Sequence, residues 1–210
     1  MAAIKNIIFD LGGVVLNIDL KASSRAFNLL FQDHGKEMLE AIIKTGALDL
    51  FETGKMNEIE FMERVSLFFN KKVQQSKLYD AWVCMLLDFP KERVDFIEKL
   101  KRNYKVFLLS NTNILQHRVF NQRFAKEFPY QSLDSFFYKA YYSFEMGLRK
   151  PNPAIFKTVL ADSGILAHET LFIDDFAENI ETAQQLGFKT ALHPQNGDLK
   201  YITGLLEAMN

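Results

Sequence analysis

Four short polar segments, far apart in the sequence, carry the side chains best suited to catalysis. They are Asp10, Ser110-Asn111, Arg149-Lys150 and Asp174-Asp175. Three of them directly follow runs of apolar residues that are typical of buried strands, and the fourth stands ahead of a helical pattern. Because the carboxyl ends of parallel strands meet at one edge of a sheet, we expect the four segments to lie together there.

The residue types in these segments favour chemistry on a phosphoryl group. Asp10, Asp174 and Asp175 would form a carboxylate cluster that cannot be fully ionised without a cation. Carboxylate oxygens and retained water molecules suit Mg²⁺. A lysine and a hydroxyl group beside such a metal, here Lys150 and Ser110, would neutralise and position a phosphoryl group. A carboxylate at the same place can act as a nucleophile and form an aspartyl-phosphate.

The elements that must position these segments alternate between strand and helix. Apolar runs predict strands at 4–9, 105–109, 136–141, 170–173 and 188–192. The stretches between the later runs have helical apolar spacing, and Asn152-Pro153 is a typical start for one of these helices. Strands that alternate with helices indicate an α/β fold, a Rossmann-like parallel sheet with helices on both faces.

The stretch between the first two predicted strands is longer than a crossover helix requires. It carries several helical patterns, among them a capping box at Asn57 and Glu60 that opens a helix predicted to reach Phe69. The predicted domains are an inserted helical cap at 17–88 and a core made of residues 1–16 and 89–210. Since loops at the carboxyl ends of strands line the ligand crevice, we expect the cap to cover the site.

Composition and charge exclude several classes of protein. Of 210 residues, 48% are hydrophobic and 24% charged, which is typical of a globular protein and not of a disordered one. The chain has 25 basic and 26 acidic residues, so no net field would attract nucleic acid or an anionic membrane. No apolar stretch approaches the ~20 residues of a membrane span. The single cysteine, Cys84, suits a reducing compartment, so we expect a cytoplasmic protein. The partner that we expect is a small molecule.

Four sequence motifs resemble those of a known enzyme family. They are FDLGGVV at 9–15, LSNTN at 109–113, GLRKP at 147–151 and FIDD at 172–175. In this order they resemble the four motifs of the haloacid dehalogenase superfamily of phosphohydrolases. The inserted helical pattern after the first motif is similar to the helical cap of the capped members. The likeness spans nearly the whole chain, and four motifs in order are specific where each alone is weak.

The resemblance implies a mechanism that begins at the first motif. Asp10 would be the nucleophile that accepts the phosphoryl group, and it would also bind the metal. Ser110 and Asn111 would bind the phosphoryl oxygens. Lys150 would neutralise both the nucleophile and the phosphate.

The same resemblance implies a Mg²⁺ cofactor. Its ligands would be Asp10, the backbone carbonyl of Gly12, and Asp174 and Asp175 of the fourth motif. Many members carry a further acid four residues after the fourth motif, where this chain has Asn179. Asn179 would orient the metal ligands without adding a charge.

Gly12 is the main departure from the pattern of the family. Phosphatases of the family usually have a second acid at this place, which protonates the leaving oxygen and later activates water. Such catalysis is worth roughly 10²–10⁴-fold. The glycine variant is most similar to a subgroup that contains bacterial α-D-glucose 1-phosphate phosphatases. An anomeric hydroxyl is a more acidic leaving group than an ordinary alcohol, so it depends less on a general acid.

The sequence therefore favours a Mg²⁺-dependent phosphatase that acts on a small phosphorylated metabolite, a sugar phosphate such as glucose 1-phosphate. Two alternatives stay open. A 2-haloacid dehalogenase belongs to a branch that also lacks the second acid and needs no metal, but the Asp174-Asp175 pair argues against it. A catalytically weak phosphate-binding or interaction protein is the other alternative, because Gly12 replaces the usual general acid.

Overall fold

A five-stranded parallel sheet forms the core of the structure. The structure is a computed structural model that describes residues 3–31, 34–67 and 73–209. The strands are β1 (Asn6–Phe9), β2 (Lys105–Ser110), β3 (Lys139–Tyr142), β4 (Thr170–Asp174) and β5 (Lys189–Leu192). They lie in the order β3-β2-β1-β4-β5, and every neighbouring pair is parallel. The predicted α/β fold with a parallel sheet is confirmed.

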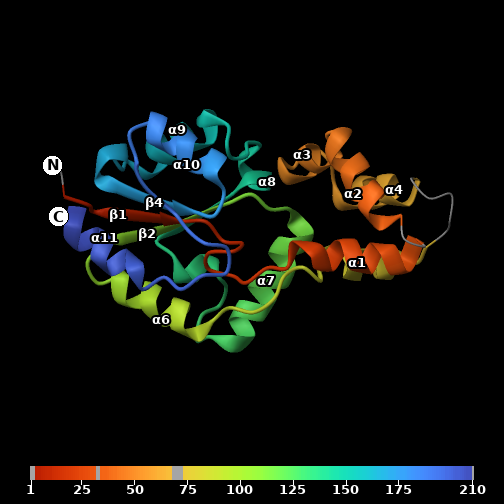
Figure 1. The fold of residues 1–210 in the computed structure, drawn as a ribbon, viewed down its shortest axis with the longest axis horizontal. Helices are drawn as coiled ribbons and strands as arrows, with labels where there is room; N and C mark the ends of the chain where they lie inside the picture. The colour runs from red at the N-terminus through yellow and green to blue at the C-terminus, as the bar shows by residue number, and fades with distance from the viewer. Residues whose placement is uncertain (1–2, 32–33, 68–72, 210) are drawn as a thin grey trace.

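Helices cover both faces of the sheet. Successive residues of a strand face opposite sides, so each strand contributes side chains to both layers. On β1, Ile7 and Phe9 belong to one hydrophobic cluster and Ile8 belongs to another. The first cluster is covered by α6 (Lys91–Leu100), α7 (Ile114–Glu127) and α11 (Tyr201–Met209). The second is covered by α9 (Pro153–Ser163) and α10 (Ala177–Gln185), on the other side of the sheet in Figure 1.

In the part of the chain that the structure describes, five further helices lie between β1 and α6 and pack together beside the sheet (Figure 1). They are α1 (Leu20–Phe31), α2 (Gly35–Lys44), α3 (Ala47–Glu52), α4 (Glu58–Leu67) and α5 (Gln75–Val83). Their own core is aromatic: Phe51 stacks on Phe61 with ring centroids 4.2 Å apart, and Trp82 meets Phe61 edge-on at 4.6 Å. No helix of the described residues is long and apolar enough to cross a membrane.

The start of α4 is the predicted capping box. The side chain of Asn57 accepts a hydrogen bond from the backbone N–H of Glu60 at 3.0 Å, and the Glu60 carboxylate accepts one from the backbone N–H of Asn57 at 3.0 Å. Two orphan donors of the helix start are thereby satisfied. The predicted end of this helix at Phe69 lies outside the described residues.

The two connections to the inserted helices run side by side in opposite directions. Ile18 and Leu86 form an antiparallel bridge. The backbone N–H of Asn17 donates to the carbonyl of Asp88 at 2.9 Å, and the side chain of Asn17 donates to the Asp88 carboxylate at 3.1 Å. The insertion therefore leaves and rejoins the core at the same place.

The strand predicted at 136–141 is shorter and begins later. A 3-10 turn, η1 (Asp134–Phe136), occupies the first part of this stretch, and β3 follows it. Phe136 packs against Phe124 of α7, with ring centroids 5.3 Å apart, rather than extending the sheet. The aromatic residues of this stretch suit a strand and a packed turn equally well, so the prediction of its start was wrong.

Candidate active site

The turn after β1 presents the first predicted site residue. Asp10 lies at the carboxyl end of β1, where its backbone N–H donates to the carbonyl of Ile173 at 2.8 Å. Gly13 has a φ of 79°, and a Cβ at this position would collide with the carboxylate of Asp175. Glycine is therefore required at 13 both by the backbone and by the close approach of the fourth motif. Gly12 lies in the same turn, beside Asp10.

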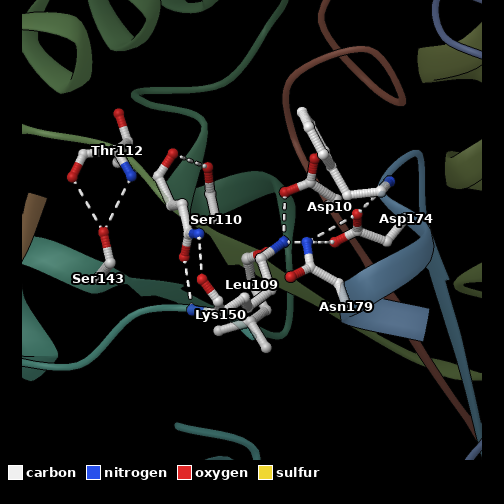
Figure 2. Close-up of polar contacts among 10 residues, drawn as sticks. Asp10, Leu109, Ser110, Thr112, Ser143, Lys150, Asp174 and Asn179 are labelled. Atoms are coloured by element: carbon white, nitrogen blue, oxygen red, sulfur yellow. Dashed lines mark hydrogen bonds and ion pairs between the residues drawn. The ribbon is translucent and has the colours of Figure 1, made fainter. Parts of the chain in front are cut away.

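Lys150 joins the first and fourth motifs. Its ammonium group donates to Asp10 Oδ1 at 2.6 Å, to Asp174 Oδ2 at 2.7 Å and to the carbonyl of Leu109 at 2.8 Å (Figure 2). The side chain is 1% exposed. Burial alone would lower the pKa of Lys150, but the two carboxylates outweigh burial and raise it. The cation therefore holds two carboxylates together in a dry site.

The side chain of Asn111 contacts the backbone of Lys150, while the phosphate contact that the resemblance implies for Asn111 stays a prediction. Its side-chain nitrogen donates to the backbone carbonyl of Lys150 at 2.8 Å, and its side-chain oxygen accepts from the backbone N–H of Lys150 at 2.8 Å. Both polar atoms of the side chain are thus used to fix the backbone that carries the ammonium group. Asn111 acts on the site by positioning Lys150.

Ser110 is buried at the end of β2, and among the described residues its hydroxyl makes one long hydrogen bond, 3.5 Å to the carbonyl of Asn111. A charged phosphoryl oxygen is a stronger hydrogen-bond acceptor than a carbonyl oxygen. The hydroxyl is therefore well suited to turn towards a ligand.

Ser143, which the sequence analysis did not single out, supports the site through the backbone of Thr112. Its hydroxyl accepts from the backbone N–H of Thr112 at 2.9 Å and donates to the carbonyl of Thr112 at 3.0 Å (Figure 2). It thereby ties the end of β3 to the turn that follows β2. The available signal was the same as for Asp10 and Ser110, a small polar residue directly after a buried strand.

Three carboxylates gather at the edge of the sheet, as predicted. Asp10, Asp174 and Asp175 each offer an oxygen, and these atoms lie within 4.8 Å of one another. Burial raises the pKa of Asp10 to about 7, against the opposing effect of Lys150. Burial and the neighbouring Asp174 raise the pKa of Asp175 to about 6.

The donor set fits a divalent cation. Asp175 Oδ1 is buried and has no hydrogen-bond partner among the residues that the structure describes. A buried acceptor of this kind is costly unless a proton or a cation reaches it. Hard oxygen ligands around one point match Mg²⁺ better than a soft metal.

Asn179 fixes the orientation of one member of the cluster. Its side-chain nitrogen donates to both oxygens of Asp174, at 2.9 Å and 3.0 Å, and the backbone N–H of Phe176 donates to Asp174 Oδ1 at 2.8 Å. Asp175 has a looser contact, 3.3 Å from the side-chain nitrogen of Gln195. The Asp174 carboxylate is therefore held rigidly, whereas that of Asp175 can adjust.

The inserted helices contact the core next to Lys150, through two acidic residues that the sequence patterns did not single out. Arg149 forms ion pairs with Asp49 and, at 3.2 Å, with Glu52 of α3. Burial raises the pKa of Glu52, while Arg149 and Lys150 act in the opposite direction. Close to this contact, a Cβ on Gly54 would collide with the carbonyl of Phe144, so the two backbones touch. No sequence motif marks such a pair, because its members come from distant segments.

The fold agrees with comparisons to known proteins. Residues 4–187 match the model of the haloacid dehalogenase-like hydrolase family. A D-ribitol-5-phosphate phosphatase from Bacteroides thetaiotaomicron is 33% identical over 196 residues, which cover 92% of this chain and 93% of that protein.

Solved structures of similar fold belong to the same family or share its fold. A haloacid dehalogenase family enzyme from Bacteroides thetaiotaomicron, in complex with magnesium and inorganic phosphate, is 33% identical with a TM-score of 0.85, covering 95% of this chain and 99% of that one. A HAD-like family hydrolase from Porphyromonas gingivalis is 40% identical with a TM-score of 0.86, covering 98% of each chain. An L-2-haloacid dehalogenase, at 16% identity and a TM-score of 0.62, shares the fold. The chain therefore belongs to the haloacid dehalogenase-like hydrolase family.

Proposed function

We propose that this protein is a Mg²⁺-dependent phosphatase that hydrolyses the phosphate ester of a small sugar or polyol. The observation that carries the proposal is the buried Lys150 ammonium between Asp10 and Asp174, beside the unpartnered oxygen of Asp175. This arrangement offers a nucleophilic carboxylate, a fixed positive charge and a place for a cation at one point. Phosphoryl transfer depends on such positioning and charge neutralisation.

The residues that would hold Mg²⁺ are Asp10, Asp174, Asp175 and the backbone carbonyl of Gly12. When bound, the ion would offset the charge of the phosphoryl oxygens. It would also favour the ionised form of the carboxylates, because burial and, to a smaller degree, mutual repulsion keep the pKa values of Asp10 and Asp175 high without it. Asn179 supports this role because it fixes the Asp174 carboxylate from behind.

The reaction has two in-line displacements at phosphorus. In the first, a carboxylate oxygen of Asp10 bonds to phosphorus, and the bond to the alcohol oxygen of the substrate breaks. In the second, water attacks the aspartyl-phosphate, so that inorganic phosphate leaves and Asp10 is restored. In both steps the ammonium group of Lys150 neutralises negative charge on the phosphoryl group and on Asp10. The hydroxyl of Ser110 donates a hydrogen bond to a phosphoryl oxygen. Residue 12 has no side chain, so the leaving alcohol takes its proton from water or from a group of the inserted helices.

The substrate of the relative differs from the predicted one. That relative is named for D-ribitol 5-phosphate, an ester of a primary alcohol, and the comparisons do not support the glucose 1-phosphate subgroup. We therefore place an open-chain polyol phosphate ahead of glucose 1-phosphate as the substrate class. Rates on D-ribitol 5-phosphate, glucose 1-phosphate and glucose 6-phosphate distinguish the two. A preference for glucose 1-phosphate over both other esters would restore the original assignment.

We also propose that residues 17–88 act as a cap over this site, with residues 1–16 and 89–210 as the core. Support comes from their separate aromatic core and from the contact of Glu52 and Asp49 with Arg149, the neighbour of Lys150. The side of the site opposite the sheet would then be closed by the cap. The leaving group would be recognised there.

The decisive experiment measures phosphate release with Mg²⁺ or with EDTA, in the wild type and in Asp10→Asn. Asn has nearly the shape of Asp but is not a nucleophile, so release should need Mg²⁺ and vanish in the variant. Native rates in Asp10→Asn would overturn the nucleophile assignment. Chloride release from 2-haloacids without metal, together with no phosphate release from phosphate esters, would favour the dehalogenase alternative.

A further inference from the structure

A cleft of about 530 Å³ lies on the core, and none of the three clustered carboxylates lines it. One wall is the first part of α6 with the preceding Pro90, and the other is the segment 196–200 that follows β5. Its volume is in the range of small-molecule sites. The cleft contains none of the residues proposed above for hydrolysis, so that reaction does not account for it.

Arg93 is a buried cation in the wall of this cleft. The residue is 6% exposed, and its Nη1 is buried without a hydrogen-bond partner among the described residues. Burial lowers the pKa of Arg93, and the charges of Asp88 and Asp198 act in the opposite direction without forming an ion pair with it. Buried arginines are normally paired, because a desolvated guanidinium without an acceptor is costly.

The acidic side chains of the cleft are mostly neutralised by other partners. Asp95 pairs with Lys91 at 2.6 Å, and Asp198 pairs with Lys200 at 3.1 Å. At the rim, the exposed side chains of Lys99 and Glu92 have opposite charges. The charge of Arg93 is therefore left for a ligand.

The segment that forms the second wall also supports the active site. Asn196 has a φ of 58°, and its backbone N–H donates to the carbonyl of Gly13 at 2.7 Å. Its side chain accepts from the backbone N–H of Ile18 at 3.0 Å and donates to the carbonyl of Ile18 at 2.8 Å. The preceding residue, Gln195, donates to the Asp175 carboxylate at 3.3 Å. A ligand in the cleft would thus touch a segment that is hydrogen-bonded to Gly13 and to the base of the insertion, and that follows the residue in contact with Asp175.

We propose that this cleft binds a small metabolite through an oxyanion group, a carboxylate or a phosphate, that pairs with Arg93, and that its binding regulates hydrolysis through Asn196. The planar guanidinium matches either group with two parallel hydrogen bonds. The ligand supplies the acceptor that Arg93 lacks among the described residues. A change in the position of Asn196 reaches Gly13 and Ile18 through the bonds described above.

Calorimetric titration of the metal-free protein tests the binding, with succinate as the carboxylate probe and methylphosphonate as the phosphate probe. Loss of a charge-assisted hydrogen bond should weaken binding about 10- to 100-fold in Arg93→Gln. Arg102→Gln is the matched control, since it removes the same charge from an exposed position just after the same helix, outside the cleft, and its affinity should equal that of the wild type. Lys99→Gln, at an exposed position, should weaken binding by a smaller factor and is not expected to disturb folding.

The result for each probe decides a separate point. The probe that binds tells whether the oxyanion is a carboxylate or a phosphate. Saturable binding of neither probe, or equal binding in wild type and Arg93→Gln, would overturn the site. Hydrolysis rates with and without the bound probe test the regulation, and rates that stay equal at saturation would overturn that part. Because binding is measured without turnover, its failure is distinct from failure of the proposed phosphatase activity.

Discussion

Replacing Lys150 with methionine removes the ammonium group between Asp10 and Asp174 and keeps a side chain of similar length. That group is 1% exposed and lies 2.6 Å and 2.7 Å from oxygens of the two carboxylates. Removing one partner of a buried ion pair leaves an uncompensated charge and costs about 3–5 kcal/mol. We expect the metal-free variant to lose about this much free energy of unfolding. It should also lose turnover, since no cation then faces the nucleophile.

Urea unfolding at neutral pH, in EDTA and again with Mg²⁺, measures this loss. Lys139→Met is the control, because Lys139 also pairs with a carboxylate, that of Asp162, but its side chain is 48% exposed. Exposed ion pairs contribute only about 0–1 kcal/mol. Mg²⁺ should restore part of the stability of Lys150→Met, since it supplies charge to the same carboxylates, and should do little for Lys139→Met. Equal stability of the two metal-free variants would refute the argument.

Two further predictions concern the same cluster. Burial raises the pKa of Asp10 to about 7 and that of Asp175 to about 6, so the folded protein keeps protons that the unfolded chain has lost, and metal-free stability should fall as pH rises from about 4 to about 7. Urea titrations measure this slope, which Asp175→Asn should reduce; a slope unchanged by that substitution contradicts it. Gly12→Asp should fold normally, because a Cβ there meets the side chain of Ile18 at 3.4 Å, an ordinary contact. A carboxyl at this place should raise phosphate release by up to roughly 10²–10⁴-fold, and an unchanged rate would show that proton transfer is not limiting.

The convergence of Asp10, Lys150, Asp174 and Asp175 was predictable because it depends on topology. Each residue follows a strand or a turn whose type the local pattern indicates, and parallel strands bring such positions to one edge. The contact of Asn179 with Asp174 was also within reach, since both belong to one strand–helix unit. Local sequence and fold class together determine these positions.

The remaining contacts depend on side-chain geometry between distant segments. The pairing of Asn111 with the backbone of Lys150, and of Glu52 with Arg149, follows from the docking of elements whose relative placement no local pattern fixes. The late start of β3 has a similar cause, because Phe136 packs on α7 instead of joining the sheet. In these cases tertiary packing, and not local secondary-structure propensity, determines the structure.

The bridge between Ile18 and Leu86 has a consequence for the order of folding. β1 and β2 are neighbours in the sheet, with Phe9 opposite Leu108, although the whole insertion separates them in the chain. An insertion that folds first, around its own aromatic core, closes this bridge and shortens the loop between the two strands from about 95 residues to about 30. The entropic cost of pairing them then falls by about 1 kcal/mol. The helices beside the sheet would thereby bring the central strand, β1, and its neighbour β2 together.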